Sequence, residues 1–194
     1  MDKVSPGFIE FMHFMGNMIE LKGWHRYRAG LDVTHGSTGE KSLFATWNDH
    51  EVMFHVAPLL PLQPKDPQQI ERKRHIGNDV LVIVYHDSDL PYQIKSLTSK
   101  QTHIVCLVRP VKGGYGVEFL VKEGVPAFQP LWKTPIMLSK TRQSRELLLE
   151  KCINGIKAIY QHVPAFSDKI AKTRLAMLED LLHKYVPESQ AGRV

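Results

Sequence analysis

The chain opens with apolar side chains at helical spacing. Ser5 and Pro6 are typical of a helix start, with serine as the N-cap and proline in the first turn. The pattern predicts an amphipathic helix that continues to Gly23. Its polar face lacks lysine and arginine, which favours packing against a core over binding to a membrane surface. The apolar face consists of Phe8, Phe11, Met12, Met15, Met18 and Ile19.

Apolar runs predict strands in the middle of the chain. Residues 23–50 are rich in glycine and small polar side chains and are expected to form loops and edge strands, with strand-like pieces at 24–27 and 43–47. β-Branched and aromatic residues predict a strand at 51–56. Residues 79–85 are almost continuously apolar, which predicts a strand covered on both faces in the middle of a sheet.

A hairpin and two helices are predicted in the second half of the chain. Residues 101–111 and 115–122 have strand patterns, and Gly113 and Gly114 between them suit the positive φ angles of a tight antiparallel turn. Residues 187–194 lack a pattern and are expected to be a flexible tail. Two long helices precede this tail, marked by Leu147, Leu148, Cys152, Ile153, Ile156, Ile159 and Tyr160, and then by Ile170, Leu175, Leu178, Leu181, Leu182 and Tyr185.

Together these elements predict the α/β class. We expect a single domain over residues 1–186, with a central mixed, largely antiparallel sheet, a short helix at 67–77 and two C-terminal helices that close the core. The composition agrees, since 194 residues with 43% hydrophobic and 23% charged side chains are typical of one folded domain. The N-terminal residues lack the apolar stretch of a signal peptide, and no apolar run is long enough to predict a membrane span.

The cysteines indicate the redox environment of the protein, and the net charge indicates the charge of its binding partner. Cys106 and Cys152 lie in apolar patterns, which indicates buried, reduced thiols and therefore a reducing, cytoplasmic location. The net charge of +5 favours a partner that carries negative charge, such as nucleic acid, a lipid surface or an acidic protein. Charge alone does not choose among the three.

The sequence patterns of common nucleotide and metal sites do not fit. Residues 36–42 look like a phosphate-binding loop, but two residues rather than four separate the glycines, and Glu40 precedes the lysine. Residues 113–116 precede no predicted helix, so they do not form a dinucleotide-binding motif. No histidine or cysteine cluster has metal-ligand spacing, and we expect no metal. His55 and His103 are expected to be strand residues with hydrogen-bonded rings.

The helix predicted at 67–77 has a polar surface that a core does not require. Its start is predicted from a capping box at Asp66, Pro67 and Gln69. Because the dipole favours cations near a helix C-terminus, a solvated helix end is one explanation of the basic run 72–74. That explanation does not account for Asn78, whose side chain ends in an amide. At helical spacing, a single face carries Glu71, Arg74, His75 and Asn78.

Asn78 has two interpretations. It follows Gly77 at the helix end and precedes a buried strand, so its backbone is expected to be fixed from both sides. A carboxamide both donates and accepts hydrogen bonds, and it can therefore orient a water against a phosphate, as a glutamine does in many GTPases. Alternatively, Asn78 is only a helix C-cap, because asparagine tolerates left-handed dihedrals. Spacing alone leaves both interpretations open.

The segment around Asn78 resembles the catalytic domain of the Rap GTPase-activating proteins, a family related to tuberin and the Ral activators. The signature is Arg72-Lys73-Arg74-His75-Ile76-Gly77-Asn78-Asp79, preceded by Asp66-Pro67-Gln68-Gln69. Ala29 stands where the family more often has a glycine. The resemblance covers about residues 7–185 and includes the segments 21–32, 51–56, 125–128 and 146–154.

The resemblance implies a domain that docks on a small Ras-family GTPase in its GTP-bound state, with Rap as the first candidate and Rheb or Ral as the next. Asn78 stands at the position of an asparagine "thumb" that the family inserts beside the γ-phosphate, without an arginine finger. Lys73, Arg74 and His75 would support binding of the GTPase. GTP and Mg²⁺ would belong to the partner, so the chain would need no cofactor. The chain would be a GTPase activator rather than an enzyme, contributing one catalytic residue in trans.

Two other functions remain open at this point. A non-catalytic GTPase-binding or scaffold module would keep the docking face without accelerating hydrolysis, and only the retained Asn78 argues against it. Binding of nucleic acid through the basic helix is disfavoured, because the face carries Glu71 and no aromatic residue that could stack on a base. The oligomeric state is not predicted.

Overall fold

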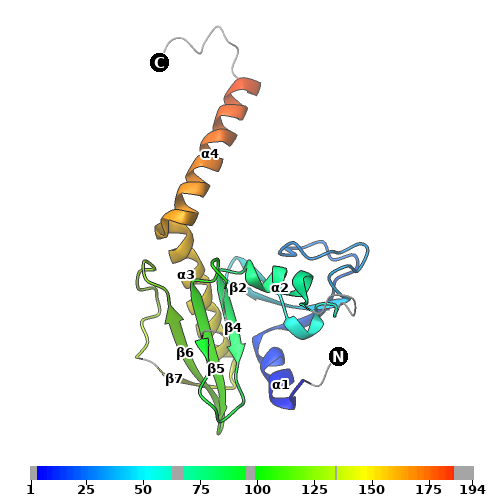
Figure 1. Ribbon diagram of the computed structural model, residues 1–194, viewed down its shortest axis with the longest axis vertical. Coiled ribbons are helices and arrows are strands. Elements are labelled where there is room, and N and C mark those ends of the chain that lie inside the picture. Colours follow the sequence, from blue (N-terminus) through cyan, green and yellow to red (C-terminus); the bar gives the residue numbers. More distant parts are fainter. Residues whose placement is uncertain (1–3, 63–67, 95–98, 134, 186–194) are drawn as a thin grey trace.

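The computed structural model describes residues 4–62, 68–94, 99–133 and 135–185, which form two sheets and four α-helices (Figure 1). The α/β class is as predicted, and the tail predicted at 187–194 lies outside the described residues. The elements are α1 (Pro6–Met15), β1 (Asn17–Glu20), β2 (Lys41–Trp47), β3 (His50–Phe54), the 3₁₀ helix η1 (Ala57–Leu59), α2 (Ile70–Gly77), β4 (Leu81–Tyr85), β5 (Ile104–Val111), β6 (Gly114–Val121), β7 (Ile136–Ser139), α3 (Arg142–His162) and α4 (Pro164–Tyr185).

Helix α1 begins where the sequence predicts and ends earlier. The Ser5 hydroxyl accepts a hydrogen bond of 3.2 Å from the Phe8 N–H, which caps the first turn. The prediction that the helix continues to Gly23 is wrong. At Gly16 the chain passes so close to β2 that an added Cβ would lie 2.6 Å from the Phe44 carbonyl oxygen. The chain therefore leaves the helix there and continues as strand β1.

The first sheet has three antiparallel strands in the order β1-β2-β3. The piece predicted at 43–47 lies in β2, which is the central strand rather than an edge strand. The piece predicted at 24–27 belongs to a loop. The sequence could not identify β2 as central, because the two strands that cover its edges come from the segment predicted as helix and from residues 50–54.

The second sheet has the order β4-β5-β6-β7 and mixes both pairing directions. The predicted hairpin is confirmed, since β5 and β6 pair antiparallel around Gly113, whose φ is +82°. Strand β4 pairs parallel to β5 and lies at the edge, so its predicted place in the middle of the sheet is wrong. Its five residues are all half-buried. An apolar run reports how the faces are covered but not whether both edges are paired.

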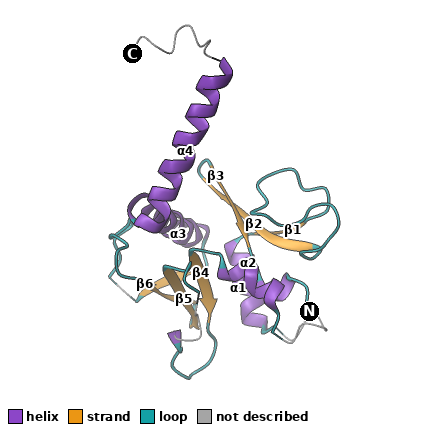
Figure 2. Cartoon of the chain, turned by 45° about the horizontal axis from the view of Figure 1, so that its top comes forward, coloured by secondary structure: helices purple, strands orange, loops and turns teal. Residues whose placement is uncertain are grey.

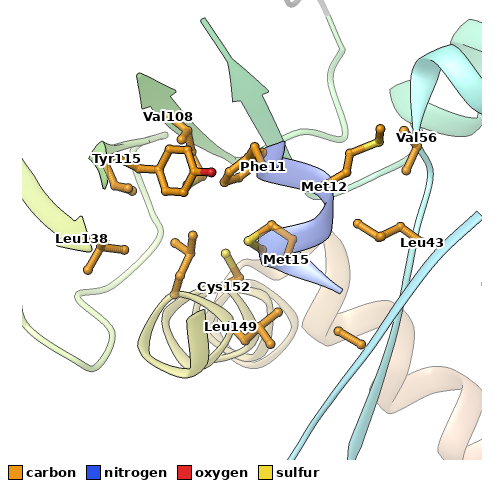
Figure 3. Close-up of a cluster of buried hydrophobic side chains, with 14 residues drawn as sticks. Phe11, Met12, Met15, Leu43, Val56, Val108, Tyr115, Leu138, Leu149 and Cys152 are labelled. Atoms are coloured by element: carbon orange, nitrogen blue, oxygen red, sulfur yellow. The ribbon is translucent and has the colours of Figure 1, made fainter. Parts of the chain in front are cut away.

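Helix α1 joins the two sheets into one core (Figure 3). Phe11 and Tyr115 meet edge to face with ring centroids 5.1 Å apart, and the predicted packing of the apolar stripe of α1 is confirmed. The residues that surround α1 come from three places: Leu43 and Val56, then Val108 and Tyr115 of the second sheet, and Leu149 and Cys152 of α3 (Figure 3).

The core also contains Cys106. Burial raises the pKa of the Cys106 thiol well above its usual range, so this reduced cysteine is a poor nucleophile.

A buried lysine of α3 holds the loop that follows β6. The Lys151 ammonium donates to the carbonyl oxygens of Phe128 at 2.6 Å and Pro130 at 2.9 Å. It lies 4.0 Å from the centre of the Phe128 ring, with the rings of Phe119 and Trp132 at 5.7 and 5.8 Å. Burial lowers the pKa of this ammonium. The contacts replace the hydration that Lys151 loses on folding.

The two C-terminal helices are present as predicted, but α4 contributes little to closing the core. Helix α4 projects from the rest of the chain and contributes no buried residue (Figures 1 and 2). Phe166 in its first turn is half-buried against the core, whereas later apolar residues such as Leu178 and Leu182 are exposed. Helical spacing predicts a helix but does not say what its apolar face contacts. Within the described residues, no helix has the length and apolar character needed to cross a membrane.

Candidate functional site

Helix α2 is short, and it starts later than the sequence predicts. It begins at Ile70, so it is shorter than the helix predicted at 67–77, and Gln69 is its N-cap with a φ of +52°. The predicted caps Asp66 and Pro67 lie outside the described residues. Arg72 donates to the Leu60 carbonyl oxygen through Nε at 3.3 Å and Nη2 at 2.9 Å. This residue of the basic run therefore ties α2 to the chain that follows η1.

Asn78 ends α2 with its side chain exposed. Its backbone has φ −91° and ψ −7°, in the right-handed region. Asn78 is thus the C-cap of α2, as in the alternative interpretation, but without the left-handed dihedrals on which that interpretation relied. The conformation at this position does not require an asparagine, and the presence of an exposed carboxamide here has no explanation in the backbone.

The polar face of α2 borders a pocket of about 540 Å³. Arg74, His75 and Asn78 line it together, as their helical spacing predicts, whereas Lys73 does not line it. Among the lining residues that the structure describes, Arg72 and Arg74 bring positive charge and none is acidic, so we refer to this site as the cationic pocket. The other lining residues are Ala29, Gly30, Ser37, Thr38, His55, Leu60, Pro61 and Arg72.

A long loop between β1 and β2 supplies the opposite wall of the pocket, and Asp32 holds its shape. Hydrogen bonds from backbone N–H groups, led by that of His35, keep the pKa of Asp32 far below its usual range. The carboxylate accepts bonds from Thr34 N (2.9 Å), Thr34 Oγ1 (2.9 Å), His35 N (3.1 Å), Ser37 N (2.8 Å) and Ser37 Oγ (2.8 Å).

The same loop is fixed to β3 through Glu51. This carboxylate accepts a hydrogen bond of 2.9 Å from the Tyr27 N–H and lies 2.7 Å from Nη2 of Arg26. The Tyr27 bond, followed by that of Arg26, holds the pKa of Glu51 below its usual value. The wall opposite α2 is therefore a structured loop.

Ala29 in this wall has a φ of +49°, in the left-handed region that glycine favours. We expect Ala29→Gly to raise the free energy of unfolding by about 0.5–1 kcal/mol, because relief of the left-handed strain outweighs the added freedom of the unfolded chain. Urea denaturation of the two proteins measures the difference. A lower stability of the glycine variant would contradict this prediction.

The carbonyl oxygens of the two residues that flank Asn78 accept hydrogen bonds from hydroxyls that the sequence did not point to. The Ser99 hydroxyl donates to the Gly77 carbonyl oxygen, and the Thr102 hydroxyl donates to that of Asp79 at 2.9 Å. The Asp79 N–H donates to the Ile76 carbonyl oxygen at 3.1 Å. The exposed amide thus stands on a fixed backbone, as the sequence interpretation requires.

His55 is a further residue whose role the sequence analysis missed. It follows β3, and its ring is hydrogen-bonded as expected. Nδ1 lies 3.1 and 3.0 Å from the two carboxylate oxygens of Asp79, and Nε2 lies 2.9 Å from the Ala29 carbonyl oxygen. The ring also meets that of His75 edge to face, with centroids 5.4 Å apart. Only its position in the segment 51–56, where the resemblance extends, was a signal.

Residues 1–175 match the family described as Rap/ran-GAP. The chain belongs to the Rap/ran-GAP family. The Rap/ran-GAP chain is 42% identical over 187 residues to a PH and Rap-GAP domain-containing protein of Dictyostelium discoideum. It is 36% identical over 189 residues to the human GTPase-activating Rap/Ran-GAP domain-like protein 3 and 36% identical over 191 residues to the mouse signal-induced proliferation-associated 1-like protein 1. Each comparison covers 95% of this chain but only 15%, 19% and 11% of the respective relative.

A solved structure shares the architecture of this Rap/ran-GAP chain. The TSC2 GAP domain superposes with a TM-score of 0.66 at 25% sequence identity, covering 79% of this chain and 85% of that domain. The resemblance deduced from the segment around Asn78 is thereby confirmed at the level of family and fold. The roles of Asn78, Lys73, Arg74 and His75 stay predictions.

Proposed function

We propose that this Rap/ran-GAP domain stimulates GTP hydrolysis by a small Ras-family GTPase in its GTP-bound state, and that Asn78 is the residue it contributes. The observation that carries the proposal is the exposed carboxamide of Asn78 on a fixed backbone beside a cationic pocket. The relatives named as GTPase-activating proteins support it. Rap is the first candidate partner, followed by Rheb and Ral.

The proposed mechanism is positioning with electrostatic support. The Asn78 amide orients the attacking water against the γ-phosphate by donating and accepting hydrogen bonds, and it takes up no proton. GTP and Mg²⁺ belong to the partner, so the domain needs no cofactor of its own. A GTPase partner and two buried, reduced thiols support a cytoplasmic location.

Association is proposed to depend on the cations next to the thumb. We expect Arg74→Ala and His75→Ala to raise KM by up to about tenfold with a small change in kcat, because both residues line the pocket. Lys73→Ala is expected to have a smaller effect, because Lys73 is exposed outside the pocket lining, and Lys157→Ala at an exposed position of α3 is the control. KM measured at several salt concentrations tests this, since added salt should weaken binding of the wild type most. An Arg74→Ala variant with normal KM would contradict the prediction.

Hydrolysis by a panel of purified GTPases tests the proposed function. Rap, Rheb and Ral loaded with GTP are mixed with the domain or with buffer, and phosphate release is followed in single turnovers. Acceleration of at least one GTPase is the expected result. Binding without acceleration would favour a scaffold module, and neither binding nor acceleration would contradict the proposal.

A further inference from the structure

The His55 ring bridges two groups that only accept hydrogen bonds. A backbone carbonyl oxygen and a carboxylate have no proton to donate, so both contacts are satisfied only when both ring nitrogens carry hydrogen. The two contacts therefore favour an imidazolium paired with the Asp79 carboxylate. Its side chain is only 10% exposed, which leaves little room for water to replace either partner.

Asp79, which the His55 ring contacts, is the residue next to Asn78 in the sequence. Its carboxylate is held by His55 and its carbonyl oxygen by Thr102, so both polar ends of the residue are fixed. The same imidazolium holds the carbonyl oxygen of Ala29 in the opposite wall of the pocket. One ring thus links the wall, the residue after the thumb and, through His75, helix α2.

We propose that His55, paired with Asp79, is a positioning residue that sets the orientation of the Asn78 carboxamide. This inference deepens the proposed function and rests on it for its kinetic test. His55 itself does not touch the nucleotide in this scheme. It acts through Asp79, and its contribution requires the charged form of the ring.

The charges around His55 fix the direction of the expected pH dependence. Asp79 faces it from the end of α2, His75 faces it from the helix itself, and the cations Arg72 and Arg74 line the same pocket. Burial lowers the pKa of His55, but the hydrogen bond and charge of Asp79 outweigh it, so the pKa is raised. The ion pair is therefore complete below the ordinary histidine pKa and is lost as the pH rises through the raised one.

A double-mutant cycle in single-turnover hydrolysis tests the inference. His55→Gln, which is neutral at every pH, is expected to lower kcat by about 10- to 100-fold and to leave KM nearly unchanged. In the Asn78→Ala background the same substitution should cause no further loss, because its effect passes through the missing amide. The wild-type rate relative to His55→Gln should fall as the pH rises. His13→Gln, at an exposed position of α1, is the matched control and should change nothing.

Asp79→Asn gives a second measurement in case His55→Gln unfolds. It keeps the shape of the side chain and removes the charge, so it should reproduce both the loss of kcat and the loss of pH dependence. Additive effects of His55→Gln and Asn78→Ala, or a rise in KM alone, would overturn the inference while the proposed function stands.

The side-chain amide signal of Asn78 in a ¹⁵N–¹H spectrum is a readout that needs no GTPase. It is assigned by its absence in Asn78→Ala. The signal is expected to shift with the titration of His55 in the wild type and to stay constant in His55→Gln. If no GTPase responds to the domain, the proposed function fails, and this titration alone decides whether His55 controls the amide. An Asn78 signal that is the same in both proteins at every pH would overturn the inference.

Discussion

Asn78→Ala is expected to lower stimulated GTP hydrolysis by about 10²- to 10³-fold at saturating domain. The factor is typical of removing one preorganised polar group from a reacting centre, and it corresponds to about 3–4 kcal/mol in the barrier. KM should change little, because the residues proposed to bind the GTPase, Lys73, Arg74 and His75, remain. Single-turnover phosphate release with excess domain measures kcat directly.

Stability separates this effect from a folding defect. The Asn78 side chain is exposed, so its removal should change the free energy of unfolding by no more than about 0.5 kcal/mol. Asn17→Ala is the matched control, an exposed asparagine of β1 outside the pocket lining, and it should keep full activity. Full activity of Asn78→Ala would show that another group orients the water.

Lys151→Met is expected to have the largest effect on stability, lowering the free energy of unfolding by about 3–5 kcal/mol. Two carbonyl oxygens, those of Phe128 and Pro130, lose a charged donor that each contacts at 2.6 or 2.9 Å. Methionine has a similar length and keeps the apolar contacts with the surrounding rings, so the loss reports mainly the hydrogen bonds and the charge. Urea denaturation followed by tryptophan fluorescence measures it.

Lys157→Met provides the comparison on the same helix. Lys157 is an exposed residue of α3, and its replacement should change stability by less than about 0.5 kcal/mol. If both variants lost equal stability, helix propensity or net charge would explain the effect better than the contacts of Lys151. A Lys151→Met protein as stable as the wild type would contradict the assigned role.

Local signals in the sequence predicted the local features of the fold. The Ser5-Pro6 start of α1 and the glycine turn of the β5-β6 hairpin depend on backbone preferences that neighbouring residues fix. The early end of α1 could not be predicted, because Gly16 is required by the carbonyl of Phe44, a residue of another strand. The edge position of β4 and the projection of α4 likewise depend on which other segments lie next to them, and an apolar pattern does not identify those segments.

In the candidate site, too, the sequence predicted the local features but not the long-range contacts. Helical spacing placed Arg74, His75 and Asn78 on one face, and the structure places them along one pocket. The residues that hold Asn78 come from distant segments and carry no motif: a hydroxyl at Thr102 and a ring at His55 look like ordinary strand-end residues in the sequence. The sequence therefore indicated which side chains of α2 line the pocket, but not the residues from distant segments that hold Asn78 in place.

The parallel pairing of β4 with β5 places the support of Asn78 in a later part of the chain. A parallel neighbour forces the chain to travel back along the sheet, and the hydroxyls that grip Gly77 and Asp79 arrive 22 and 23 residues later in the sequence. Contacts between residues this far apart in the sequence slow folding relative to contacts between near neighbours. A nascent chain that ends at β4 lacks both hydroxyls, so the backbone around Asn78 gains their support only after Ser99 and Thr102 have been synthesised.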